Sequence, residues 1–216
     1  MHLRSFFAGL SVFLIAAAAF AAETVRLGEL EIEEKYVFVD KDNITHVYLT
    51  YDNLEYLSDI LYEKLKAKNI KLKGLVSIPR GGLEPTCKLS QRIGKEQVLG
   101  DDLIIKTHHL KSYSDENKQE AIRELSSVEL ENQGEGWVYV DDLTDKGQTF
   151  GFIANKYPKA LRICWIAKPQ GEHSAHYYAI KVPQETWIVF AYEQKLIDFY
   201  KDKALAETQI NALENK

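Results

Sequence analysis

An apolar run that ends in clustered acids constrains the fold of this chain more than any other feature. Residues 137–140 read Trp-Val-Tyr-Val, Asp141 and Asp142 follow directly, and Asp145 stands two positions before a glycine. From 150 to 157 the sequence becomes amphipathic. The pattern predicts a buried strand, an acidic turn and a helix that begins at the turn. Backbone N–H groups at a helix start suit a phosphate, and acids beside them suit ribose hydroxyls and a hard cation.

A second turn of the same kind lies earlier in the chain. Arg80-Gly81-Gly82 follows the apolar residues 74–79 and precedes a helical pattern over 83–93 that ends at Gly94. Glycines permit close approach of the backbone to a pyrophosphate, and an arginine adds a forked cation. A strand, a glycine turn and a helix in this order are typical of a phosphate site, and the acidic turn strengthens that interpretation.

The alternation of strand and helix patterns gives the fold class. It predicts an α/β domain with a mainly parallel, twisted sheet flanked by helices, in which both turns lie at the carboxyl edge of the sheet. Helices are expected over 51–65, 83–93 and 150–157, and strands over 74–79, 103–106, 137–140, 161–167 and around Ile180 and Trp187.

The first 22 residues have the pattern of a secretory signal peptide. His2 and Arg4 precede an apolar run that ends at Phe20, and Ala-Phe-Ala at 19–21 fits a signal-peptidase site. The run is shorter than the ~20 residues that span a bilayer, which disfavours the alternative of an uncleaved anchor. We therefore expect an exported protein, periplasmic or secreted, without stable membrane insertion after signal removal; an unprocessed N-terminus would make it cytoplasmic.

The remaining chain divides into three parts. Residues 23–45 are charged, with one strand-like run at 36–39, and are expected to form an N-terminal extension that packs on the domain. The domain itself is expected over 46–195. Residues 196–216 carry apolar positions among charges and predict a C-terminal amphipathic helix.

Composition and cysteine content narrow the partners. The formal charge of -5 and the lack of a dense Lys/Arg block argue against nucleic-acid binding. Cys87 and Cys164 would permit a disulfide in an exported protein, and two packed free thiols are the other reading. The strongly polar stretch 112–133 is expected to be a mobile surface segment, part loop and part solvated helix.

Six segments in their order along the chain resemble the type I phosphoribosyltransferases, most closely the bacterial xanthine-guanine (6-oxopurine) phosphoribosyltransferases. The likeness spans about residues 46 to 195 and implies the type I fold, with a small hood beside the main sheet. The segments are 77–85 (Ser-Ile-Pro-Arg-Gly-Gly-Leu-Glu-Pro), 112–113, 134–145, 157–160, 167–169 and 182–188 (Val-Pro-Gln-Glu-Thr-Trp-Ile).

The resemblance implies a role for each residue that matches a motif of the family. Asp145 would be the catalytic residue, sharing the proton at purine N7. The other assignments are Arg80, Gly81 and Gly82 to pyrophosphate; Asp141 and Asp142 to ribose; Asp145, Lys146, Gly147, Gln148 and Thr149 to the 5′-phosphate; Lys168, Trp187 and Ile188 to the purine; Ser112 and Tyr113 to a lid; and Asp142 with Glu193 to metal.

The implied reaction is Mg2+-dependent transfer of 5-phosphoribose from phosphoribosyl pyrophosphate to xanthine, guanine or hypoxanthine, with release of pyrophosphate. The resemblance also implies a homo-oligomer. The alternative is an exported protein that has this fold and binds a nucleotide or nucleobase without catalysis. Two features keep this alternative open. Lys146 stands where the family usually has a threonine, and an export signal separates the chain from a cytoplasmic cosubstrate.

Overall fold

A computed structural model describes residues 24–68, 72–96, 103–113 and 119–214. The predicted signal peptide lies outside these described residues. No helix within them is long and apolar enough to span a membrane.

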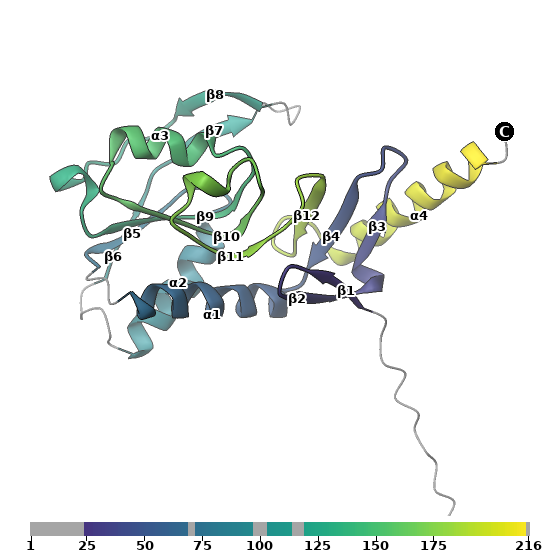
Figure 1. The fold of residues 1–216 in the computed structure, drawn as a ribbon, viewed down its shortest axis with the longest axis horizontal. Helices are drawn as coiled ribbons and strands as arrows, with labels where there is room; N and C mark the ends of the chain where they lie inside the picture. Colours follow the sequence, from purple (N-terminus) through teal and green to yellow (C-terminus); the bar gives the residue numbers. More distant parts are fainter. Residues whose placement is uncertain (1–23, 69–71, 97–102, 114–118, 215–216) are drawn as a thin grey trace, which may run out of the picture.

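Five parallel strands form the central sheet (Figure 1). Their order across the sheet is β11, β10, β9, β5 and β6, and every neighbouring pair is parallel. The carboxyl ends of these strands therefore meet at one edge, where ligands bind in sheets of this kind. The strands are β5 (Gly74–Ser77), β6 (Ile104–Thr107), β9 (Trp137–Thr144), β10 (Leu161–Ala167) and β11 (Tyr177–Lys181).

Helices cover both faces of this sheet, which confirms the predicted α/β class. α1 (Tyr51–Ala67) and α2 (Leu83–Glu96) lie on one face, and α3 (Gln148–Lys156) lies on the other (Figure 1). α1 begins at a capping box in which Thr50 and Asn53 bond to each other's backbone N–H groups. One apolar core fills the space between the sheet and α1 and α2, and a second fills the space under α3.

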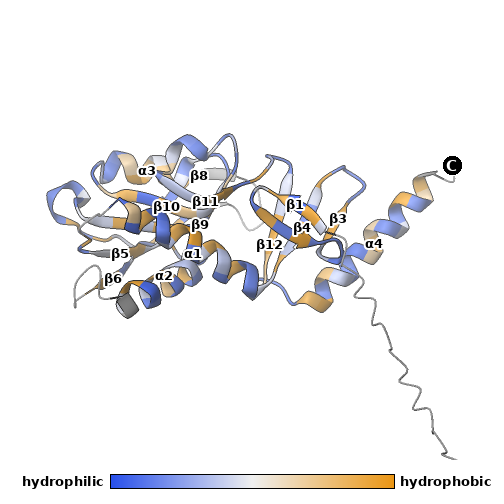
Figure 2. Cartoon of the chain, turned by 60° about the horizontal axis from the view of Figure 1, so that its bottom comes forward, coloured by the Kyte–Doolittle hydropathy of each residue, from blue (hydrophilic) through white to orange (hydrophobic). Residues whose placement is uncertain are grey.

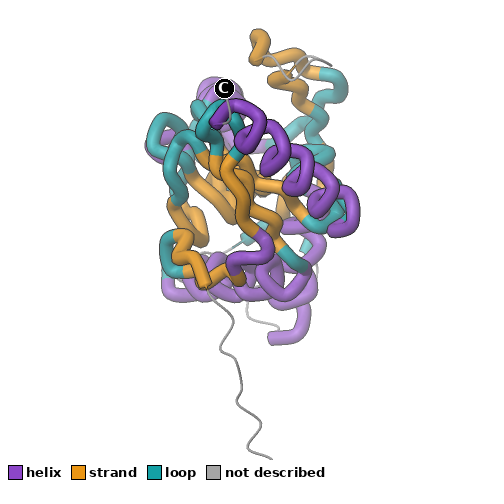
Figure 3. Tube along the Cα trace, turned by 90° about the vertical axis from the view of Figure 1, so that its right-hand side faces the viewer, coloured by secondary structure: helices purple, strands orange, loops and turns teal. Residues whose placement is uncertain are grey.

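A smaller sheet stands beside the main one, as the expected hood. It contains β3 (Val37–Val39), β4 (Thr45–Leu49) and β12 (Thr186–Phe190), with β4 in the middle. Hydrophobic residues run along β4 and β12 (Figure 2). The C-terminal helix α4 (Leu196–Glu214) crosses this sheet (Figure 3), and Phe199 anchors it against Tyr48 and Val189.

The N-terminal residues contain more structure than the sequence pattern indicated. β1 (Thr24–Leu27) and β2 (Leu30–Glu33) form an antiparallel hairpin whose turn contains Gly28 at a φ of +62°. Leu27, Leu30 and Ile32 belong to the main apolar core. The short period-two pattern of these residues was the missed signal. The hairpin therefore contributes to the core of the fold.

The polar stretch after β6 is a hairpin and not the solvated helix that its charge pattern suggested. β7 (Leu110–Tyr113) pairs with β8 (Gln119–Glu124), and a short 3-10 turn, η2 (Glu131–Gly134), leads into β9. Leu110 and Ile122 pack against the core under α3, and the other side chains of the hairpin are mostly polar.

The two cysteines are separate free thiols. Cys87 is exposed on α2, and Cys164 is buried on β10. The sequence left two possibilities open, a disulfide or two free thiols. In the structure the two residues are not joined by a disulfide.

Candidate active site

The acidic pair lies within a strand and not in the turn after it. β9 continues through Thr144, so that Asp141 and Asp142 point to opposite sides of the strand. The hydroxyl of Tyr192 donates to Oδ2 of Asp142 at 2.6 Å, and the backbone N–H of Asp142 donates to Oδ1 of Asp141 at 3.1 Å. Burial raises the pKa of Asp141, and the charge of Asp142 raises it further. Burial also raises the pKa of Asp142, against the opposing effect of the Tyr192 hydrogen bond.

The Arg-Gly-Gly turn packs directly against this acidic strand. A Cβ added to Gly81 would lie 2.4 Å from Oδ2 of Asp142, and one added to Gly82 would lie 2.2 Å from the carbonyl oxygen of Val140. Only glycine fits such a close approach. Arg80 is exposed at the start of the turn, beyond a cis peptide bond. The turn thus brings backbone and a cation to the edge where the acids lie.

Glu193 faces the same point from the segment between β12 and α4. Glu193 is exposed at its surface, but local desolvation and the charge of Asp142 raise its pKa, and the charge of Arg80 lowers it. Glu193 is therefore close enough to Asp142 and Arg80 to interact with both electrostatically. Carboxylate oxygens suit Mg2+, which keeps several ligands from water and substrate phosphates. The described residues contain no group of three or more His, Cys, Asp or Glu side chains able to hold a metal.

The acidic turn ends at the N-terminus of α3. Gly147 is the N-cap residue of α3, with a φ of +79°, and it makes no side-chain cap to the first turn of backbone N–H groups. Such uncapped N–H groups, together with the helix dipole, favour an anion. Lys146 and Gln148 are exposed beside the turn, and Thr149 is partly buried in the first helical turn. The predicted 5′-phosphate residues therefore lie together at the start of α3, a place that suits an anion.

Asp145 is held by two side chains from other loops. The Lys168 ammonium lies 3.3 Å from Oδ1 of Asp145, and the Gln184 amide donates to the same oxygen at 2.6 Å. Lys168 follows the end of β10 and is buried, and its backbone N–H donates to the carbonyl oxygen of Thr144 at 3.0 Å. Two of the predicted site residues, Asp145 and Lys168, are thus in direct contact.

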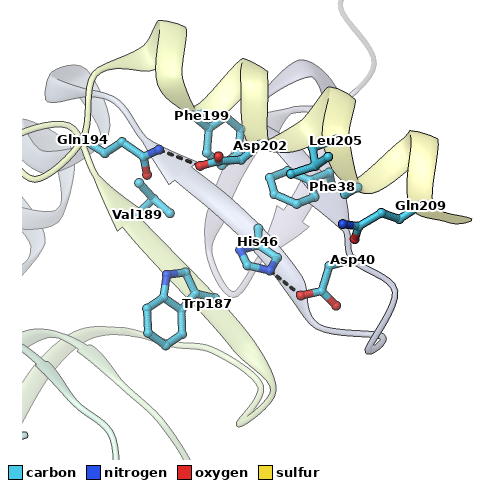
Figure 4. A pocket seen from close by; sticks show the side chains of 11 residues that line it. Phe38, Asp40, His46, Trp187, Val189, Gln194, Phe199, Asp202, Leu205 and Gln209 are labelled. Carbon is cyan, nitrogen blue, oxygen red and sulfur yellow. Dashed lines mark hydrogen bonds and ion pairs between the residues drawn. The ribbon is translucent and has the colours of Figure 1, made fainter. Parts of the chain in front are cut away.

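Trp187 and Ile188 lie on β12, in the smaller sheet. Ile188 is buried in the main core, and Trp187 is 50% exposed opposite His46 of β4. Trp187 borders a hollow of about 250 Å³ between this sheet and α4 (Figure 4). Its walls come from β3, β4, β12 and α4, where Phe38 stacks on His46 with ring centres 4.5 Å apart. Trp187 lies on the smaller sheet, whereas the Asp145–Lys168 pair lies at the edge of the central sheet, and the purine role of Trp187 stays a prediction.

The predicted lid residues Ser112 and Tyr113 lie at the end of β7, in the β7–β8 hairpin. His108, between β6 and β7, connects the base of this hairpin to the core. Its Nδ1 lies 2.8 Å from the Tyr139 hydroxyl, and its Nε2 lies 2.7 Å from Oε1 of Glu124 on β8.

Sequence reasoning missed three side chains that organise the site, Tyr192, Gln184 and His108. Tyr192 adjoins Glu193, and Gln184 lies inside the segment 182–188, so position was the available signal for both. Their hydrogen-bond partners are distant in sequence, so no sequence pattern could reveal these hydrogen bonds.

A parallel sheet with an Arg-Gly-Gly turn packed on an acidic strand, and an anion-binding helix start after it, defines a class of protein. That class is the type I phosphoribosyltransferases.

Comparison with known proteins places the chain within that class. It is 30% identical over 151 residues to the xanthine-guanine phosphoribosyltransferase of Gluconobacter oxydans, a match that covers 69% of this chain and 86% of that protein. The structure is similar to the purine phosphoribosyltransferase of Pyrococcus horikoshii, with a TM-score of 0.54 and 25% identity over 69% of this chain and 94% of the other. The xanthine-guanine-hypoxanthine phosphoribosyltransferase of Helicobacter pylori shares the fold, with a TM-score of 0.54 and 18% identity over 72% and 99% of the two chains. No family model matches the sequence.

The chain belongs to the xanthine-guanine phosphoribosyltransferase family. It is an enzyme of the purine phosphoribosyltransferase type.

Proposed function

We propose that this enzyme transfers 5-phosphoribose from phosphoribosyl pyrophosphate to a 6-oxopurine, with Mg2+ and with release of pyrophosphate. The observation that carries the proposal is the contact of 3.3 Å between Lys168 and Asp145 beside the uncapped start of α3. A buried ammonium can donate to a carbonyl oxygen, and a carboxylate can accept a proton from a ring nitrogen. The pair therefore suits a base that presents an oxygen and an ionisable nitrogen on neighbouring atoms, as a 6-oxopurine does.

The remaining groups would each bind a different part of phosphoribosyl pyrophosphate. The backbone at Gly81 and Gly82, with Arg80, would bind the pyrophosphate; Asp141 and Asp142 would bind the ribose hydroxyls. The 5′-phosphate would bind at the residues from 145 to 149. Holding both reactants in one orientation removes much of the entropic barrier to displacement at the ribose C1.

Asp142 and Glu193 are the residues that would hold Mg2+. Desolvation raises the pKa of both carboxyls, and a cation bound beside them would favour their charged forms. A bound Mg2+ would neutralise charge on the departing pyrophosphate. The lid residues Ser112 and Tyr113, in the β7–β8 hairpin, would exclude water during the transfer.

A turnover assay tests the proposal. The full chain would be incubated with phosphoribosyl pyrophosphate, Mg2+ and, in turn, xanthine, guanine, hypoxanthine and adenine, and pyrophosphate release would be followed. We expect turnover with at least one 6-oxopurine and much less with adenine. Binding of a nucleotide without turnover of any base would instead identify a non-catalytic binding protein.

A pair of lysine variants tests the purine assignment. Lys168→Met should raise the KM for the 6-oxopurine by about 10-fold or more, the value of one charged hydrogen bond. Lys159→Met, at an exposed ion pair with Glu135, is the matched control and should leave KM unchanged. Equal KM values in the two variants would remove Lys168 from the purine site.

We also propose that the enzyme is exported and assembles as a homo-oligomer. The support for export is the pattern of residues 1–22, and N-terminal sequencing of protein from the producing cell tests it: a start at Met1 would contradict export. The support for assembly is the exposed apolar surface on α4, where Ile197 and Leu205 are each more than half exposed. Light scattering on the purified protein would give the mass, and a monomer would contradict it.

A further inference from the structure

Gln184 connects two loops of the active site through one side chain. It lies between β11 and β12, and its Nε2 donates to Oδ1 of Asp145 at 2.6 Å. Its Oε1 accepts the backbone N–H of Gln170 at 3.1 Å. A carboxylate can only accept and a backbone N–H can only donate, so these two partners fix the orientation of the Gln184 amide. The side chain is therefore held at both ends.

The same carboxylate oxygen also receives Lys168. Gln170 follows Lys168 by two positions in one loop, so Gln184 ties that loop to the acidic turn while Lys168 reaches across from it. Two donors on one oxygen leave the Asp145 carboxylate little freedom to rotate. Active sites depend on such supporting hydrogen bonds, because a base that is misplaced by an ångström loses much of its rate.

We propose that Gln184 is a positioning residue for the reaction, which orients the Asp145 carboxylate toward the proton of the bound purine. This inference rests on the proposed function of Asp145. Gln184 lies in a loop that has no proposed role in binding the phosphates or the metal.

Gln184 could otherwise serve only to fasten the loop through Gln170. The chemistry of two substitutions separates these roles. Gln184→Glu keeps an oxygen to accept the N–H of Gln170, but it loses the donor to Asp145 and adds a negative charge beside it. Gln184→Met has a similar length and loses both hydrogen bonds without adding charge.

The two roles predict opposite orders of activity. If Gln184 positions Asp145, kcat should fall from wild type to the Met variant and further to the Glu variant, by at least about 10-fold in the latter. If Gln184 only fastens the loop, the Glu variant should match wild type and the Met variant should be the weaker. The KM for phosphoribosyl pyrophosphate should stay within about twofold, because the pyrophosphate turn is untouched.

Three measurements make the outcome decisive. Wild-type turnover comes first: its absence would overturn the proposed function, whereas its presence with wild-type kcat in Gln184→Glu would overturn the role of Gln184. Glu185→Gln, the exposed neighbour, is the control and should keep kcat within about twofold. Melting temperatures show whether each variant folds; if the Glu variant does not, wild-type kcat in the Met variant alone overturns the inference.

Discussion

The Tyr192 hydroxyl donates to Oδ2 of Asp142 at 2.6 Å, and so a phenol from the segment after β12 holds a carboxylate of β9. The ring of Tyr192 stacks on Phe190, with ring centres 5.3 Å apart, which fixes the direction of the hydroxyl. Burial and the charge of Asp142 raise the pKa of Tyr192, so the phenol remains a donor at neutral pH. The hood sheet and the central sheet are thereby joined at the proposed metal position.

Tyr192→Phe should weaken the use of Mg2+. Without this donor the Asp142 carboxylate can rotate, and we expect the Mg2+ concentration for half-maximal rate to rise about 10-fold, the equivalent of about 1.4 kcal/mol. Titration of the rate with Mg2+ at saturating substrates would measure it. Tyr177→Phe on the edge strand β11 is the matched control, and an equal effect in both would show that Tyr192 does not act through Asp142.

Gly81→Ala should impair the site because a methyl group would meet the Asp142 carboxylate at 2.4 Å. Either the turn or Asp142 must shift, and we expect kcat/KM for phosphoribosyl pyrophosphate to fall at least about 100-fold. Steady-state kinetics would measure the loss.

Gly151→Ala is its control, because a Cβ at Gly151 meets nothing within 4 Å. Alanine is the better helix former by about 1 kcal/mol, so this variant should be as active as wild type and slightly more stable. Wild-type activity in Gly81→Ala would contradict the close packing of the turn.

Asp145→Asn should separate binding from catalysis. The amide keeps the shape of the side chain but cannot accept the purine proton, so kcat should fall about 100-fold or more. Calorimetric binding of the nucleoside monophosphate product should change little. Asp198→Asn, on α4, is the control for the change of charge; turnover of Asp145→Asn at the wild-type rate would show that another group takes the proton.

His108 should make the protein less stable in acid. Burial lowers the pKa of His108 below its usual 6.5, although Glu124 opposes this effect. The unfolded chain then binds a proton more readily than the folded one, and stability is lost as pH falls through about 6.5. The groups that face the imidazole are Tyr139, Glu124, Tyr157 and Lys156, the last through its own ion pair with Glu124.

Urea unfolding between about pH 5.5 and 8 measures this dependence. The half-buried acids Asp141 and Asp142 change stability in the opposite direction, because a raised carboxyl pKa costs stability as pH rises. Asp141 and Asp142 contribute equally in wild type and in His108→Gln, so the difference between the two proteins isolates the effect of His108. In the variant, the free energy of unfolding should no longer fall at low pH on account of this histidine. Parallel curves for the two proteins would contradict the assignment, and His173→Gln, at an exposed position, controls for loss of a histidine.

The sequence predicted the parts of the fold that depend on local pattern. The apolar run before Asp141 and the glycines after Arg80 are contiguous signals, and they located β9, both turns and the start of α3. The prediction ended β9 too early because acids disfavour strands in general, whereas here their neighbours in β10 continue the ladder through Thr144.

The residues that sequence did not assign act across long separations. Gln184 meets Asp145 from 39 positions away, and Tyr192 meets Asp142 from 50. Neither has a composition or spacing signal, because their partners are set by how the loops of separate strands meet. The hairpin β1–β2 was missed for a different reason: each strand has only four residues, too few for its alternation to stand out among charges.

The position of the β1–β2 hairpin affects when the predicted signal peptide could be removed. A cut after residue 22 would leave only Glu23 before β1 begins at Thr24, and Leu27 of β1 is part of the main core. A peptidase needs an extended stretch of chain, which a paired strand anchored to the core does not offer. If a signal peptide is cleaved at this site, we expect cleavage to be faster before the hairpin docks on the core than after it.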